Sequence, residues 1–199
     1  MVSQADRRAG TRAVLIEASI AGLIELGLAG YTVNDIVTRS GLSNGALYRY
    51  FPTKTDLLAA TIQELLVRST RSYRAQFAAI DPAEMTVERA LWVMWDIMTA
   101  PEFAAVLDTY AAARTDPVLS EAMTTVLAPC TAEHRNLAKM TFVQLGYPEE
   151  YAAPAAILAV NAIQGLAIVR DLISEKDAPE ILVGALTWIA TTLFDMPPG

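Results

Sequence analysis

Apolar residues recur at helical spacing along most of the chain, separated by short polar or proline-containing stretches. From residue 7 to residue 26 apolar side chains return every three or four positions, and Gly27 follows as a C-terminal stop. Further runs of this kind lie at 53–79, 86–99, 101–114, 117–145, 152–169 and 181–194. The run at 117–145 forms one helix or a broken pair. No segment alternates with the period of a strand, so the pattern predicts an all-α fold.

Residues 31–58 carry a dense set of helix start and stop signals. Thr32 can cap a short helix, and Asp35 stands three residues on, as in a weak capping box. Gly41 lies where the end of that helix needs a left-handed residue. Ser43 can then cap a second short helix. Helix, glycine turn and short helix together predict a helix-turn-helix of the DNA-binding kind.

The second short helix is bounded as clearly at its other end. Leu47 and Phe51, four residues apart, can turn inward together. Pro52 cannot continue the helical hydrogen-bond ladder and stops it. Thr53, with Asp56 at the capping-box distance, begins a long helix predicted to connect this unit to the rest of the chain.

The polar side chains of this stretch suit DNA. The second helix opens with small residues that leave its N-terminal amides open to a phosphate. Asn44 and Arg49 are of the types that hydrogen-bond adenine and guanine edges. Tyr48, Tyr50 and Lys54 can reach phosphate oxygens. The residues expected to contact DNA are Thr32, Asn34, Ser43, Asn44, Gly45, Ala46, Tyr48, Arg49, Tyr50 and Lys54.

The segment from Gly41 to Leu58, GLSNGALYRYFPTKTDLL, resembles the DNA-binding signature of the tetracycline-repressor (TetR) family of bacterial transcription regulators. Asn44 stands where that family often has a basic residue, and Ala46 where it often has a hydroxyl. These two positions bear on which operator is bound. The resemblance implies a three-helix DNA-binding head at 1–54, a connector helix at 53–79 that transmits ligand binding, and a larger helical domain at 55–199 for effector binding and dimerisation.

A helix-turn-helix can also be a plain structural corner in a helical protein. The Tyr-Arg-Tyr set at 48–50, the Phe-Pro-Thr-Lys junction at 51–54 and the arginines near the N-terminus favour DNA binding instead.

Charge is distributed unevenly. The chain carries a formal net charge of −7, yet residues 1–54 hold six basic against four acidic side chains, a net charge of +2. The acidic bulk therefore lies outside the head, and the weakly basic head predicts modest non-specific affinity and a need for dimerisation. The single cysteine, Cys130, excludes an internal disulfide, and no signal-peptide pattern follows the polar N-terminus, so we expect a cytoplasmic protein.

The last two predicted helices are uncharged over 152–169 and 181–194. Pro154, Asn161 and Gln164 interrupt the first, and the second is too short to span a bilayer, so we expect no membrane partner. A helix that is apolar nearly all round must be covered on two sides. The cover is either the protomer's own core or a second copy, which would give a homodimer through a four-helix interface. The small residues Ala155, Ala156, Ala159 and Ala162 would allow close approach there.

Aromatic and soft apolar side chains gather in the region between the connector helix and these last helices. They are either plain core or the lining of an effector pocket. The polar Asn161 and Gln164 could bind an effector, bond to nearby backbone or face the dimer partner. The candidate effector-binding residues are Trp92, Trp95, Met98, Phe103, Leu107, Tyr110, Asn161 and Gln164.

No set of residues points to catalysis or a metal. His134 is the only histidine, and the adjacent Glu133 would face a different direction on a helix. We therefore expect no catalytic residue, no metal and no cofactor. The sequence predicts a ligand-responsive regulator that binds a double-stranded DNA operator and a small-molecule effector, most often a repressor in the resembling family. The alternatives are a helical enzyme acting on an apolar substrate and a constitutive DNA-binding dimer with a filled second domain.

Overall fold

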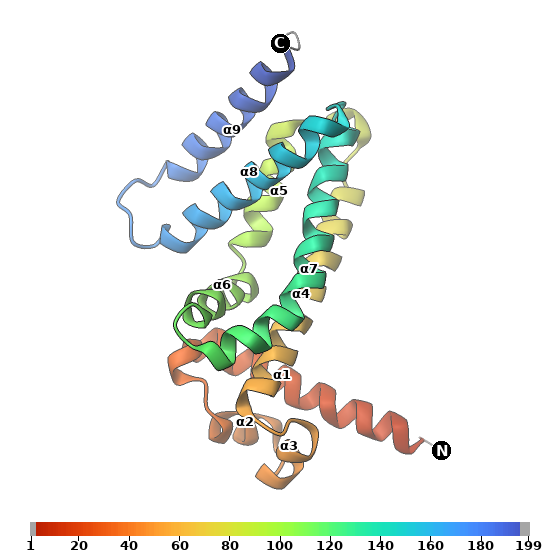
Figure 1. Ribbon diagram of the computed structural model, residues 1–199, viewed down its shortest axis with the longest axis vertical. Coiled ribbons are helices and arrows are strands. Elements are labelled where there is room, and N and C mark those ends of the chain that lie inside the picture. The colour runs from red at the N-terminus through yellow and green to blue at the C-terminus, as the bar shows by residue number, and fades with distance from the viewer. Residues whose placement is uncertain (1–2, 196–199) are drawn as a thin grey trace. The chain divides into compact units, whose positions relative to one another are not determined.

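The computed structural model describes the backbone of residues 3–195 and the side chains of residues 3–192. This part of the chain is helical and contains no strand, which confirms the all-α prediction (Figure 1). The helices are α1 (Gln4–Gly30), α2 (Val33–Ser40), α3 (Asn44–Tyr50), α4 (Lys54–Ala78), the short η1 (Pro82–Glu84), α5 (Val87–Met98), α6 (Pro101–Ala113), α7 (Pro117–Gln144), α8 (Glu149–Val169) and α9 (Ala178–Asp195).

The helices group into two compact units. The first unit contains the chain up to Arg68 together with Pro101–Cys130, and the second contains Ser69–Ala100 together with the described chain from Thr131 onward. This grouping differs from a simple division at residue 54, because α6 packs on α1. The functional boundary between head and effector domain stays a prediction.

The core of the first unit forms where α1 meets the two short helices. Leu15 and Leu23 of α1 are buried, as are Ile36 of α2 and Leu47 of α3. The backbone of α1 departs from helical angles at Gly27, whose φ of 63° and ψ of 178° produce a kink at the predicted stop. The α1 stripe thus supports the helix-turn-helix from behind, as expected of an amphipathic helix.

The core of the second unit lies among α5, α7, α8 and α9. Its buried side chains include Leu91, Phe142, Ile163 and Leu186. The alanine face of α8 points into this core: Ala152, Ala156 and Ala159 are each at most 2% exposed. Ala156 and Ala159 therefore pack within the protomer, which corrects the expectation that they lie at a dimer contact.

Two further features of the helices bear on the sequence predictions. The helix α7 runs unbroken through Pro129, so residues 117–144 form one helix. The helices α1 and α8 are long and apolar enough to cross a membrane by length and composition alone. Length and hydropathy do not separate a spanning helix from one that a protein covers, and the buried faces of α1 and α8 pack in their units.

Candidate nucleic-acid interface

The first helix of the helix-turn-helix is fixed at both ends. The Thr32 hydroxyl accepts a hydrogen bond from the Asp35 amide at 3.2 Å. Gly41 adopts the left-handed conformation, with φ 67° and ψ 15°, and its N–H donates to the Val37 carbonyl. The Asp35 carboxylate accepts a hydrogen bond from the Arg39 guanidinium at 2.7 Å, so its negative charge is paired with that arginine. The glycine turn between α2 and α3 is the one that the sequence predicts.

The recognition helix α3 is held by a cap and two buried side chains. Ser43 accepts from the Ala46 amide at 3.2 Å. Leu47 and Phe51 are buried, and the Phe51 N–H closes the helix on the Leu47 carbonyl at 3.0 Å. Because these residues anchor one face of the helix, the orientation of the opposite face is fixed.

The junction into α4 is a complete capping box. The Thr53 hydroxyl accepts from the Asp56 amide at 3.0 Å, and the Asp56 carboxylate accepts from the Thr53 amide at 2.9 Å. Lys54 is the first residue of α4 and is exposed. Its ammonium nitrogen lies 5.2 Å from the centroid of the buried Tyr31 ring, within the range of a cation–π contact.

The predicted DNA-contacting residues mostly line the outer surface of the head. Asn44, Gly45, Tyr48 and Arg49 of α3 are exposed, whereas Ala46 and Tyr50 are half-buried. The other predicted contacts, Thr32, Asn34, Ser43 and Lys54, are also exposed. Residues able to hydrogen-bond base edges are thus exposed to solvent on one short helix.

Two arginines of α1 also lie at this surface. The sequence pattern did not predict that these arginines contact aromatic rings. The Arg8 guanidinium carbon lies 6.0 Å from the Tyr50 ring centroid, and that of Arg12 lies 5.4 Å from the Phe51 ring centroid. The four-residue spacing of Arg8 and Arg12, one helical turn, was the available signal. These contacts bring positive charge from α1 to the end of α3.

Two other basic side chains of the first unit, those of Arg39 and Arg68, are already paired. Arg39 contacts Glu25 at 2.8 Å and Asp35 at 2.7 Å, and these hydrogen bonds raise the pKa of Arg39 above its ordinary value. Arg68 pairs with Glu17 and Glu64. Among the described residues no ion pair includes Arg49 or Lys54. Their charges therefore remain open to phosphates or bases.

The candidate effector residues fall in different surroundings. Trp92, Trp95 and Met98 are half-buried against the core of the second unit. Phe103, Leu107 and Tyr110 belong to the first unit, where the first two are buried. Asn161 is exposed and donates to the Ile157 carbonyl of its own helix at 2.7 Å, and Gln164 is half-buried. Whether any of these residues binds an effector stays a prediction.

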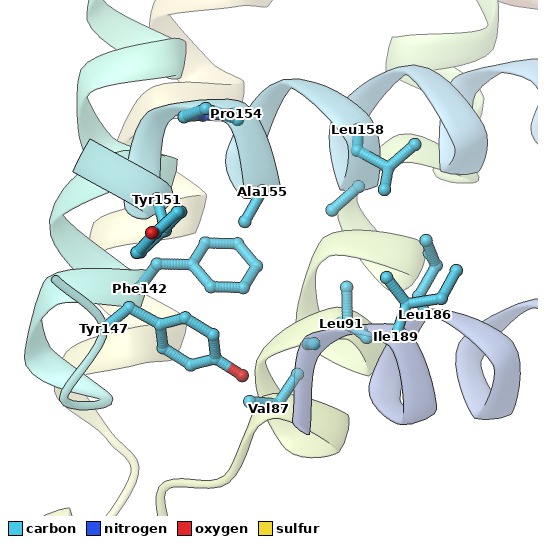
Figure 2. A pocket seen from close by; sticks show the side chains of 12 residues that line it. Val87, Leu91, Phe142, Tyr147, Tyr151, Pro154, Ala155, Leu158, Leu186 and Ile189 are labelled. Carbon is cyan, nitrogen blue, oxygen red and sulfur yellow. The ribbon is translucent and has the colours of Figure 1, made fainter. Parts of the chain in front are cut away.

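The second unit contains an apolar pocket that the sequence did not predict. It has a volume of about 140 Å³ and is lined by residues of α5, α7, α8 and α9 and by Tyr147 (Figure 2). None of the eight candidate effector residues lines it.

His134 and Glu133 point to different partners. The Nε2 atom of His134 lies 2.9 Å from the Thr70 hydroxyl, and burial lowers the pKa of the imidazole. Glu133 pairs with Arg74 at 2.6 Å. In the part of the chain that the structure describes, no group of three or more His, Cys, Asp or Glu residues is placed to hold a metal ion.

Comparison with known proteins decides the family. Residues 15–61 match the family model described as "Bacterial regulatory proteins, tetR family". An uncharacterized HTH-type transcriptional regulator of Mycobacterium bovis is 33% identical over 95% of this chain and 97% of its own length. The chain belongs to the TetR family of bacterial regulatory proteins. The HTH-type transcriptional regulator CymR of Pseudomonas putida is 30% identical over 83% of this TetR-family chain and 82% of its own.

Solved structures share the fold of this TetR-family protein. A putative transcriptional regulator of Pseudomonas aeruginosa PAO1 covers 96% of both chains with a TM-score of 0.68 and 22% identity. The multidrug binding protein EbrR, complexed with imidazole, covers 94% of this chain and 96% of its own with a TM-score of 0.67 and 17% identity. The family match and the Mycobacterium bovis relative show that the protein is a helix-turn-helix transcriptional regulator, in a family of DNA-binding regulators rather than enzymes.

Proposed function

We propose that this TetR-family protein is a dimeric, cytoplasmic repressor that leaves a palindromic operator when a small, largely apolar or aromatic effector binds. The observation that carries the proposal is the recognition helix α3, in which Asn44, Tyr48 and Arg49 are exposed while Leu47 is firmly buried. A recognition helix needs this division between an anchored face and a polar face.

The head residues divide into two roles. Asn44 and Arg49 hydrogen-bond base edges, because amide and guanidinium groups match adenine and guanine in the major groove. Tyr48, Tyr50 and Lys54 contact phosphates, together with Thr32, Asn34 and Ser43 and the amides near Gly45 and Ala46. Arg8 and Arg12 add positive charge next to the end of α3.

Dimerisation uses the exposed faces of α8 and α9, which lie side by side in the second unit (Figure 1). Along α8 the exposed residues repeat at Ile157, Asn161, Gly165 and Ile168. Along α9 the exposed apolar and small residues are Ile181, Gly184, Ala185 and Trp188. Each stripe returns every three or four residues, and a Cβ built on Gly165 or Gly184 would meet no atom within 4 Å. Two copies can therefore approach closely by two-fold symmetry.

The stripe on α9 offers a direct test of the dimer. Trp188 is 67% exposed. Trp188→Glu places a charge in the proposed interface, and we expect monomers in sedimentation equilibrium and loss of operator binding. Val118 on α7 is also 67% exposed but lies in the first unit, so Val118→Glu is the matched control and should stay dimeric. A dimeric Trp188→Glu would contradict the interface.

Effector binding in the second unit favours a dimer whose heads no longer match the half-site spacing, a population shift between two states. The connector α4 joins the two units and bonds to α7 in the second unit, where the Tyr73 hydroxyl lies 2.6 Å from that of Thr141. The pocket favours an effector over a filled second domain, and EbrR, a multidrug binding protein of the same fold, is described with imidazole.

The experiment for this function is a search for compounds that release the protein from DNA upstream of its own gene. A neutral aromatic compound that dissociates the complex at saturation is the expected result. Operator binding that no such compound changes would leave a constitutive DNA-binding dimer instead.

A further inference from the structure

The turn after α7 fixes two aromatic rings against each other. Gly146 has φ 92°, a conformation that L side chains rarely adopt. The Gly146 N–H donates to the Val143 carbonyl and the Tyr147 N–H to the Phe142 carbonyl, both at 3.0 Å. This is a Schellman motif, which characteristically brings the residue after the glycine onto the last turn of the helix. Phe142 and Tyr147 accordingly meet edge to face, with ring centroids 5.3 Å apart.

These rings form one wall of the apolar pocket. Figure 2 shows Phe142 and Tyr147 beside Ala155, with Leu91, Leu186 and Ile189 on the other side. Phe142 and Tyr147 are buried, whereas Leu158, which also lines the pocket, is 48% exposed. The pocket therefore has a packed inner wall and an outer residue at which a molecule can enter from solvent.

The size and chemistry of the pocket limit what it can hold. Its volume is about 140 Å³. An apolar cavity of about 150 Å³ accepts benzene and stays free of water otherwise. Among the described residues that line the pocket none is charged, and the polar side-chain groups are the hydroxyls of Tyr147 and Tyr151. A charged ligand would lose its hydration without gaining a counter-charge.

We infer that this pocket binds a single uncharged six-membered ring, aromatic or aliphatic, with at most one small substituent. The inference gives the proposed effector response its site and its ligand class. The Tyr147 hydroxyl is directed past the rings toward Val87 (Figure 2). Burial raises the pKa of Tyr147, so the hydroxyl stays neutral at physiological pH.

The test uses toluene as the neutral probe and benzoate as its charged counterpart, with the full-length protein. Ligand-observed NMR should show saturable toluene binding and no matched benzoate binding. Ala155→Phe places a ring in the pocket and should abolish toluene binding. Leu158→Ala removes part of the outer wall and should weaken toluene about fivefold, the loss of roughly one to two methylene contacts.

Val143→Ala is the matched control. Val143 follows Phe142 on α7 and is 43% exposed, but it lines neither the pocket nor the proposed dimer stripes. It should bind toluene as the unaltered protein does, which separates a pocket effect from a general effect of trimming an exposed apolar side chain. Circular dichroism would show whether Ala155→Phe still folds, and the half-exposed Leu158→Ala provides the same test without filling the core.

Several results would overturn the inference. These are an absence of toluene binding, equal binding by Ala155→Phe in its folded form, and equal weakening by Leu158→Ala and Val143→Ala. An absence of toluene binding joined to tighter self-association would mean that a second copy fills the pocket. DNA binding is measured separately on the same preparation. A negative toluene result then does not bear on operator binding, and a negative operator result does not bear on toluene binding.

Discussion

Three buried hydroxyl groups lie behind the helix-turn-helix, and the hydrogen bonds among them fix which group donates each proton. The Ser19 hydroxyl is 2.6 Å from the Tyr31 hydroxyl and 2.6 Å from the Thr61 hydroxyl, and Thr61 donates to the Leu57 carbonyl at 2.8 Å. Because the Thr61 proton is used, Ser19 must donate to Thr61, and Tyr31 must donate to Ser19. All three residues are 0% exposed. Burial raises the pKa of Tyr31 to about 12, so its proton stays in place.

Replacing Ser19 by Ala removes the middle of this relay. Two hydrogen bonds are lost, each contributing about 1 kcal/mol, and the buried Tyr31 O–H is left without its acceptor. The expected loss in the free energy of unfolding is about 2–3 kcal/mol. Tyr31→Phe removes the donor along with the bond and should cost about 1 kcal/mol. The double variant should cost less than the two single losses added together, since both act on one bond.

The assay is urea unfolding followed by circular dichroism at one fixed protein concentration, because dimerisation links stability to concentration. Thr38→Ala is the control, since Thr38 is exposed and its hydroxyl bonds only locally, to the Asn34 carbonyl. It should lie within about 0.5 kcal/mol of the unaltered protein. A Ser19→Ala cost no larger than that of Tyr31→Phe would refute the proton order.

Three further predictions concern the head and the second unit. Gly41→Ala should lower the free energy of unfolding by about 1 kcal/mol, because the left-handed backbone disfavours a side chain there although no atom would contact the methyl group. Gly10→Ala should raise the free energy of unfolding, because Gly10 lies in open space within α1 and has no positive φ. Urea midpoints would compare the two variants. Lys54→Ala should weaken binding to all DNA sequences alike and reduce the slope of log affinity against log salt by about 1. Arg49→Ala should instead relax base preference, which binding to variant operators would show. Identical behaviour of the two variants would refute the division of roles. His134 has a pKa below its ordinary 6.5 in the folded protein, so the unfolded chain binds more protons below that pH. Stability should therefore be fully present above pH 6.5 and fall as the pH drops toward the folded pKa, and His134→Gln should flatten this dependence in unfolding curves at pH 5.5 and 7.5.

The head could be predicted from the sequence almost residue by residue. Its caps at Thr32, Ser43 and Thr53 and its left-handed Gly41 depend on interactions within four residues, which a sequence displays directly. The Asp35 carboxylate was the exception, because its pairing with Arg39 competes with the capping box.

The effector region was harder because its contacts are long-range. The aromatic residues at 92–110 are neighbours in sequence, yet α5 packs in the second unit and α6 packs on α1 in the first. Helical periodicity shows that a face is apolar but not which helix covers it. Phe142 and Tyr147 were missed for the same reason, although the glycine between them, Gly146, is a local signal of the turn that joins their rings.

The most direct test of the account is equilibrium binding of the purified protein to the DNA immediately upstream of its own gene, measured across a salt series against random DNA. The account predicts sequence-selective binding by a dimer, with a log–log salt slope reflecting several phosphate contacts. Absence of binding even at low salt would contradict it.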